Sequence, residues 1–464
     1  MPVSKNQITT LNDIVDTLKL QFYPNENTTL KEIETFNNKL DDFVLIKSQA
    51  MEIKNHDSQK RFVKSKIGDV SFKVMAVAQS SFNVVLQNAD VSISLLKISP
   101  VHNNPIIKAE FRAEFLLRYG YNKAITLVKD IINNLLENYK VKVSEIHLAK
   151  DIQGYEFSTF DLHRVKTLSK TKTIFHNDIN SEYYFGNRFS GFSIGKGDEL
   201  LRVYNKTLEI TQKKEKSFIS VLSWQNNPNF NNQRNVWRIE FQLRRERLKH
   251  LLGSYGLLDS LESVISSIHS LWTYCINRFV HKNLTTKEVT EQIQCFRILK
   301  DGTFKYLASS TLRQRFQDSE ISFVWDSIQT FEKKQAPNLQ RIKDIKKPEV
   351  EYVKNGYKTI LSTFIKLKRG QFDSSELTKI LLEADNECKA KHGMSLVDNA
   401  RVKALDYIVQ AQAYYNDNGI VIDGFNEYKK DFLNNLKDTF ALIENDNSNL
   451  FTFEQFQKRI KNVS

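Results

Sequence analysis

The segment Ile107-Lys-Ala-Glu-Phe-Arg-Ala-Glu-Phe115 decides the fold class, because apolar and charged residues alternate along its whole length. A period of two places the apolar side chains on one face of a β-strand and the charged side chains on the other. Residues 121–139 follow with apolar positions at helical spacing, and residues 141–148 again have the composition of a strand. This order predicts a sheet that is covered by a helix.

The same signals continue on both sides of this unit. Short runs rich in β-branched and aromatic residues predict further strands, and longer amphipathic runs predict helices. The predicted strands are 70–77, 82–86, 91–96, 183–185, 200–204 and 236–243, and the predicted helices are 158–168 and 257–280. We therefore predict an α+β fold, with an antiparallel or mixed sheet packed by helices.

Three regions are distinguished by their patterns. Residues 1–65 are polar, and Leu11, Ile14, Val15 and Leu18 stand at helical spacing, so we expect a helical N-terminal accessory segment. Residues 66–305 hold the predicted sheet. Residues 306–464 lose the strand signal and contain long charged runs at 351–368, 375–391, 397–415 and 425–442, which predict a mainly helical C-terminal domain.

Composition indicates a polyanionic partner. The 464 residues include 67 Lys and Arg against 54 Asp and Glu, a formal net charge of +13, which favours nucleic acid. The excess is concentrated, since residues 196–250 hold twelve basic residues against six acidic ones. Clustered positive charge gains most from phosphate contacts. A solvated basic face is the alternative interpretation.

The cysteines and the hydropathy bear on the compartment. Three widely spaced cysteines, Cys275, Cys295 and Cys388, disfavour a disulfide framework or a cysteine zinc site and favour a reducing cytosol. The chain has no apolar run of about 18 residues, so no membrane span is expected. We expect a cytoplasmic protein without a membrane partner.

Two carboxylates stand where they could do chemistry. Asp151 ends a predicted strand, where a side chain can be held rigidly toward a metal ion or phosphate; the alternative is a simple turn with Gly154. Glu240 lies on the same strand face as Arg238 and Gln242. It either forms a structural ion pair or joins Asp151 around a divalent cation, and the spacing leaves both interpretations open.

A tyrosine between these carboxylates is surrounded in sequence by positive charge. Arg188, Lys196, Arg202 and Lys206 flank Tyr204, an arrangement that suits phosphate binding. Its glycines also fit an ordinary β-hairpin. The Gly-Lys-Gly at 195–197 lacks the spacing of a P-loop, so ATP hydrolysis is not expected.

The order of these motifs resembles a known family. Asp151, Tyr184-Phe-Gly-Asn-Arg188, Leu201-Arg-Val-Tyr-Asn-Lys206 and Trp237-Arg-Ile-Glu240 follow one another as in the replication initiation factor family, often called Rep_trans. That family includes initiators of rolling-circle plasmids, relaxases of conjugative elements and replication proteins of filamentous phages. The resemblance covers roughly residues 70–300.

The resemblance implies roles for individual residues. Tyr204 would be the nucleophile, assisted by Lys206 and Arg202, with Tyr184 and Tyr183 as alternative nucleophiles. Mg²⁺ or Mn²⁺ would be held by Asp151 and Glu240. Independently of the resemblance, the clustered positive charge makes Arg188, Lys196, Arg238, Arg244 and Arg245 the expected DNA contacts. His147 departs from the pattern, because relatives often have an acid at that position.

The function implied is nicking of one DNA strand at an origin, with a 5′-phosphotyrosine link and a free 3′-hydroxyl that primes replication. The expected partners are origin DNA, as duplex and as a single-stranded nick site, a host helicase and a second copy in a homodimer. A non-catalytic, sequence-specific DNA-binding regulator on a decayed nickase fold is the alternative, and His147 favours it. A phage-type structural protein would leave the ordered motifs unexplained.

Overall fold

The computed structural model describes residues 8–56, 61–78, 81–98, 104–181, 184–213, 216–253, 256–341 and 350–401, and six single positions beyond them, the last being 434. The chain divides into two compact units, Met1–Ile342 and Lys343–Ser464. This division places residues 1–65 and 306–342 with the sheet, so it does not coincide with the boundaries that the sequence predicted at 65 and 305.

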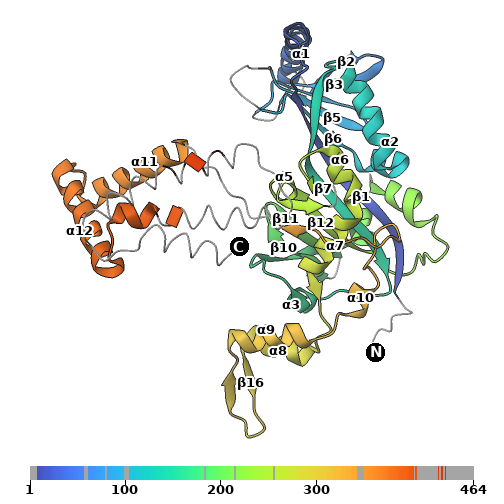
Figure 1. The fold of residues 1–464 in the computed structure, drawn as a ribbon. Coiled ribbons are helices and arrows are strands. Elements are labelled where there is room, and N and C mark those ends of the chain that lie inside the picture. The colour runs from blue at the N-terminus through green and yellow to red at the C-terminus, as the bar shows by residue number, and fades with distance from the viewer. Residues whose placement is uncertain are drawn as a thin grey trace. The chain divides into compact units, whose positions relative to one another are not determined.

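The first unit is built on an eleven-stranded sheet in which every neighbouring pair of strands is antiparallel (Figure 1). This sheet, together with the helices packed on it and the helical second unit, confirms the predicted α+β class. In spatial order the strands are β2 (Phe62–Ile67), β3 (Val70–Met75), β4 (Val84–Gln87), β5 (Val91–Leu95), β6 (Ile107–Phe111), β1 (Thr9–Pro24), β7 (Tyr139–Gln153), β12 (Trp237–Arg244), β11 (Glu199–Asn205), β10 (Tyr184–Lys196) and β9 (Lys172–Ser181).

Strand β1 corrects the prediction of an N-terminal helix. It lies in the sheet between β6 and β7, and its register against β7 shifts between Thr10 and Asn12 and again between Val15 and Thr17. Each β-bulge inserts an extra residue and reverses the alternation. Buried positions therefore fall at helical intervals in a strand, which is why the spacing of apolar residues was misleading.

Helices cover one face of the sheet. Helix α1 (Leu30–His56) packs on β2, β3 and β4, and α2 (Ala113–Asn133) packs on β1 and β6. Phe115, predicted as the end of a strand, lies in the first turn of α2 and contacts Phe111. Helices α6 (Leu261–Ser266) and α7 (Ile268–Arg278) cover the centre, where Phe241 packs edge-on against Trp272.

Smaller elements complete the first unit. They are α3 (Asp161–Arg164), β8 (Val165–Lys166), α4 (Lys206–Gln212), the π-helix η3 (Ser220–Trp224), α5 (Arg245–Leu248), β13 (Leu251–Gly253), β14 (Gly256–Leu257), β15 (Val280–His281), α8 (Thr286–Gln294), β16 (Phe296–Ile298), β17 (Phe304–Tyr306), α9 (Ser309–Asp318), α10 (Phe323–Asp326) and β18 (Gln340–Arg341).

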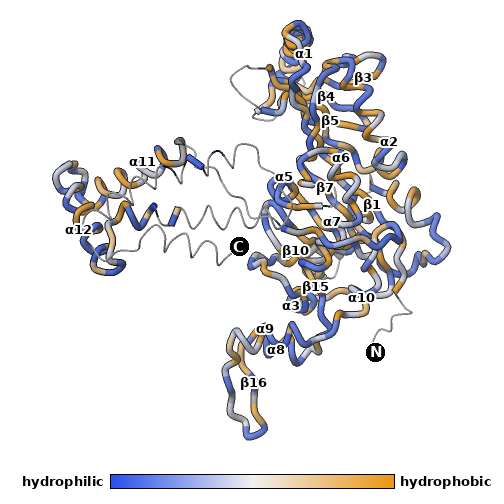
Figure 2. The backbone as a smooth tube through the Cα atoms, viewed as in Figure 1, coloured by the Kyte–Doolittle hydropathy of each residue, from blue (hydrophilic) through white to orange (hydrophobic). Residues whose placement is uncertain are grey.

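The second unit is helical in its described part. Helix α11 (Val350–Leu367) and helix α12 (Ser374–His392) carry hydrophobic residues interspersed with hydrophilic ones (Figure 2). Most of the predicted helices at 397–415 and 425–442 lies outside the described residues. Among the helices that can be described, none has the length and apolar character needed to cross a membrane.

Candidate active site

The face of the sheet opposite α7 carries a continuous row of polar side chains. Neighbouring strands are in a register that sets Tyr204 beside Arg238 and Arg202 beside Glu240. Arg238 in turn lies beside Asp151 of β7. Because side chains in register point to the same face, the alternation seen in the sequence brings these groups together across three strands.

One part of this row opens into a pocket of about 420 Å³. Tyr204, Arg202, Lys206 and Glu240 all line it, so the structure brings together four residues that the sequence singled out. Further lining residues are Asp16, Thr17, His147, Phe175, Ser190, Asn205, Glu209, Gln212, Lys213 and Lys216.

The Tyr204 hydroxyl lies at the centre of a polar network. It donates a hydrogen bond to Glu240 Oε2 at 2.9 Å and accepts one from Lys206 Nζ at 3.3 Å. Lys206 Nζ also donates to Glu209 at 2.6 Å. Burial, and then the negative charge of Glu240, raises the pKa of Tyr204 well above its usual value. Tyr204 is therefore a neutral phenol in this state.

Glu240 is the hub of the network. Its Oε1 accepts from Arg202 at 2.9 Å and lies 2.9 Å from His147 Nδ1. Burial works to raise the pKa of Glu240, but His147 and Arg202 outweigh it and lower the pKa. His147 Nε2 faces Glu145 at 3.0 Å. Burial disfavours the charged imidazole, yet the two carboxylates overcome this effect and raise the pKa of His147.

Asp16, His147 and Glu240 form a group that could hold a metal ion, because one ligand atom from each lies within 4.8 Å of the others. Two carboxylates and one imidazole suit Mn²⁺ better than Mg²⁺, which prefers oxygen ligands. The residue at which the sequence departs from the family pattern, His147, is therefore itself a candidate ligand. Of the two ligands that the sequence predicted, this group includes Glu240 and not Asp151.

Asp16 is the residue that sequence reasoning missed. It is the extra residue of β1 at the bulge between Val15 and Thr17, and Thr17 is the residue that pairs with His147. A bulge re-aims side chains and is common beside active sites. The only signal available was the polar pair Asp16-Thr17 between apolar Val15 and Leu18, in a segment interpreted as an accessory helix.

Asp151, predicted as the partner of Glu240, is placed differently. It is fully buried and forms a two-point ion pair with Arg238, at 2.6 and 2.8 Å. Trp224 Nε1 of η3 donates to it at 2.8 Å and Asn12 Nδ2 at 2.9 Å. Arg238 also pairs with Asp16. With these donors on its oxygens, Asp151 lies outside the lining of the pocket and holds Arg238 in place.

Gly191 allows β10 to approach Tyr204. It lies opposite Tyr204 in the strand pairing, with a φ of +152°. A Cβ at this position would lie 2.3 Å from the carbonyl oxygen of Val203 and 2.7 Å from the Tyr204 Cα. Any side chain would therefore push β10 away. The turn between β10 and β11 is formed at Gly197, next to Lys196.

The other predicted DNA contacts are dispersed. Lys196 is exposed at the end of β10, Arg244 pairs with Glu145 at 3.0 Å, and Arg245 pairs with Asp259. Arg188 and Tyr184 lie in β10, and their side chains are outside the described part, as is all of Tyr183.

Comparisons with known proteins add little to this geometry. No protein-family model and no curated protein sequence matches the chain. Among solved structures, a rolling circle replication initiator protein from Geobacillus stearothermophilus aligns with a TM-score of 0.31 and 11% identity. The alignment covers 66% of this chain and 96% of that one. A TM-score this low does not establish a shared fold, so the chemistry of the site depends on the residues described above.

Proposed function

We propose that this protein nicks one strand of DNA at a replication origin through Tyr204, in a reaction that requires a divalent cation. The observation that carries the proposal is the placement of the Tyr204 hydroxyl in an open pocket, within hydrogen-bond distance of Glu240 and Lys206 and beside the Asp16, His147 and Glu240 group. A phenol, a candidate cation site and basic side chains in one pocket would together support phosphoryl transfer to tyrosine.

The bond changes follow from the contacts. The Tyr204 oxygen attacks the phosphorus, the bond from phosphorus to the 3′ oxygen breaks, and a 5′-phosphotyrosine and a free 3′-hydroxyl result. Glu240 is placed to accept the phenol proton. Burial, and then the charge of Arg238, lowers the pKa of Lys206, which makes its ammonium a better proton donor to the departing 3′ oxygen.

Arg202 and the cation have complementary tasks. A Mn²⁺ or Mg²⁺ ion held by Asp16, His147 and Glu240 would polarise the scissile phosphate. Arg202 lines the pocket with about a third of its side chain exposed, so its guanidinium can turn from Glu240 to the extra negative charge of the transition state. The free 3′-hydroxyl would prime synthesis, with a host helicase unwinding the duplex.

A second candidate function has an observation in its favour. The pKa of Tyr204 is raised, and Glu240 accepts a hydrogen bond from the Tyr204 hydroxyl and also pairs with His147. A decayed site that only binds origin DNA would have this internally hydrogen-bonded network. It predicts sequence-specific binding with no cleavage.

The test is a nicking assay on supercoiled DNA that carries the protein's own locus, with Mn²⁺ or Mg²⁺ added. We expect relaxed circles bearing covalently attached protein, seen as a labelled adduct on a denaturing gel. Tyr204→Phe should abolish the adduct, and Tyr184→Phe, the rival tyrosine in β10, should keep it. If the wild-type protein forms no adduct with either metal ion, the nicking function is rejected and sequence-specific DNA binding without cleavage is the function that stands.

A further inference from the structure

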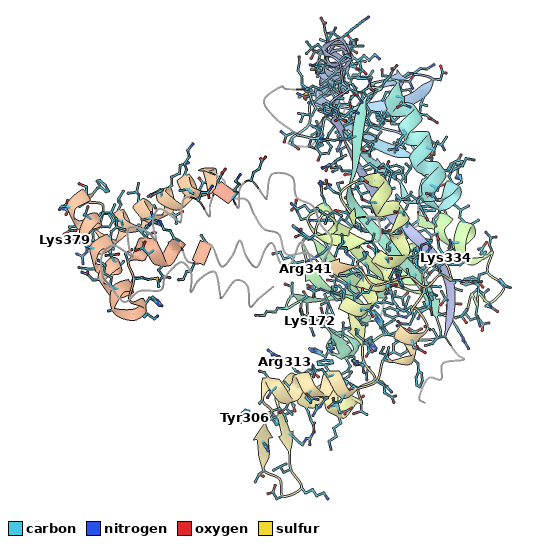
Figure 3. All side chains as sticks on the ribbon, in the orientation of Figure 1. Lys172, Tyr306, Arg313, Lys334, Arg341 and Lys379 are labelled. Carbon is cyan, nitrogen blue, oxygen red and sulfur yellow. The ribbon has the colours of Figure 1, made fainter. Side chains whose placement is uncertain are left out.

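A second pocket, of about 480 Å³, lies beside α9 and is separate from the Tyr204 site. Its lining includes four basic residues, Lys166, Lys172, Arg278 and Arg313, two of which are labelled in Figure 3. Among the described residues that line it, none is acidic. A pocket with this lining attracts an anion.

Two of these cations have no partner within the described residues. Arg278 pairs with Glu199 at 3.3 Å, and Lys172 Nζ donates to the carbonyl of Leu162 at 3.1 Å. The side chains of Lys166 in β8 and Arg313 in α9 form no ion pair or hydrogen bond with the described residues. Their charge is therefore available to a ligand.

The neighbourhood shows the effect of this excess charge. Burial, and then the positive charge of Lys166, lowers the pKa of the nearby Lys282. Burial, and then Lys172, likewise lowers the pKa of His163. An anion in the pocket would relieve this repulsion between cations.

The pocket also offers apolar surface. Leu168, whose relative exposure is 80%, and Phe316 of α9 lie in the same lining as the basic residues. Nucleic-acid grooves combine cations that follow the backbone with rings and apolar side chains that contact bases. An inorganic ion would need only the charges, so this combination favours a nucleotide chain.

Strand β9 connects the two pockets. Phe175 of β9 lines the Tyr204 site and Lys172, three residues earlier, lines the second pocket, about 10 Å apart along a strand. Because side chains alternate along a strand, Lys172 and Phe175, three residues apart, point to opposite faces of the sheet. Because β9 is the last strand of the sheet, a flexible chain can pass round its edge from one face to the other.

We propose that the second pocket binds the phosphodiester backbone of single-stranded DNA that continues beyond the nick site, with Lys166 and Arg313 as the phosphate contacts. The choice of DNA rests on the proposed nicking function, whereas the requirement for a polyanion rests on the charges of the pocket itself.

The experiment compares variants of the full chain by fluorescence anisotropy with a labelled single-stranded oligonucleotide of mixed sequence. Lys166→Ala with Arg313→Ala should weaken binding about tenfold. The dependence of log affinity on log salt should become shallower by roughly 0.7 for each phosphate that no longer meets a cation. The matched control, Lys31→Ala with Lys123→Ala, removes equal charge from exposed positions of α1 and α2 and should leave both quantities unchanged.

A charge-keeping variant, Lys166→Arg with Arg313→Lys, should retain affinity and so exclude misfolding as the cause. The inference is overturned if the alanine variant matches the control, or if it loses affinity for duplex DNA only. The adduct assay separates the two proposals. If wild-type protein forms no adduct while the alanine variant still loses affinity, nicking fails and the strand-binding pocket stands. If the wild-type protein forms the adduct and the alanine variant keeps its affinity for single-stranded DNA, only the proposal for the second pocket is overturned.

Discussion

Two acid and arginine pairs lie on the same face of the sheet and have opposite characters. Asp151 and Arg238 are both fully buried, and donors from η3 and β1 complete the shell of the carboxylate. Glu240 lies two residues from Arg238 along β12 and pairs with Arg202 of β11. Both residues of this second pair line the pocket, as does the adjoining Tyr204. The difference shows that residue type and strand position define a polar row, and that the covering elements decide which part can react.

The first prediction breaks the buried pair of Asp151 and Arg238, called here the closed pair. Arg238→Met should lower the free energy of unfolding by about 3–5 kcal/mol, because it leaves Asp151 charged, buried and without its main partner. Urea denaturation measures the change. Arg244→Ala removes an arginine from the same strand, but one that is half exposed, and should cost under about 1 kcal/mol. Similar losses of unfolding free energy for the two variants would mean that the buried Arg238 contributes no more to stability than the half-exposed Arg244.

The second prediction concerns Glu240 and Arg202, the open pair, which lines the pocket. Glu240→Gln should reduce cation-dependent nicking about a hundredfold or more, since it removes both a candidate ligand and the acceptor of the Tyr204 proton. Rates of adduct formation measure it. Glu145→Gln is the matched control, because Glu145 contacts the same His147 and does not line the pocket. The prediction is wrong if the two variants lose activity equally.

The sequence singled out both residues of the open pair, but it did not reveal the contacts that bury Asp151 in the closed pair. Period-two alternation placed Glu240 on one face of its strand, and clustered charge singled out Arg202 and Tyr204; antiparallel pairing of β11 with β12 then brings the three together. The partners of Asp151 come from Trp224 and Asn12, 73 and 139 residues away along the chain. No local pattern reports such contacts, so a saturated carboxylate was indistinguishable from a metal ligand.

The N-terminal strand shows a second limit of sequence reasoning. Two bulges in β1 gave Leu11, Ile14, Val15 and Leu18 the spacing of a helix. The same distortion places Asp16 beside His147. A bulge is set by pairing with β7, a long-range interaction, and single-sequence periodicity cannot reveal it. The error in the fold and the missed residue therefore have one cause.

The third prediction sharpens the assignment of cation ligands. Asp16→Asn should weaken Mn²⁺ binding by roughly tenfold, because it replaces a charged ligand with a neutral one. Calorimetric titration of the full chain measures the affinity. Asp13→Asn alters a neighbouring carboxylate of β1 that pairs with Lys150, and should leave Mn²⁺ affinity unchanged. Equal affinities for the two variants would exclude Asp16 from the site.

The smallest predicted effect is a pH dependence of the closed pair. Burial works to raise the pKa of Asp151, but Arg238 outweighs it and the pKa is lowered. A lowered folded pKa means that the contribution of Asp151 to stability is complete above the unfolded value of about 3.9 and is lost as pH falls through the folded value. The stability gap between wild type and Asp151→Asn should therefore narrow on acidification.

Between pH ~4.5 and ~3.5 the narrowing should be roughly 0.6 kcal/mol, which follows from protonation of the unfolded chain alone. Chemical denaturation at a series of pH values measures it, with Asp42→Asn at an exposed position of α1 as the control. A gap that stays constant would mean that Asp151 has the same proton affinity folded and unfolded. Arg238 would then not be holding it ionised, and the contrast between the closed and open ends of the polar row would lose its electrostatic basis.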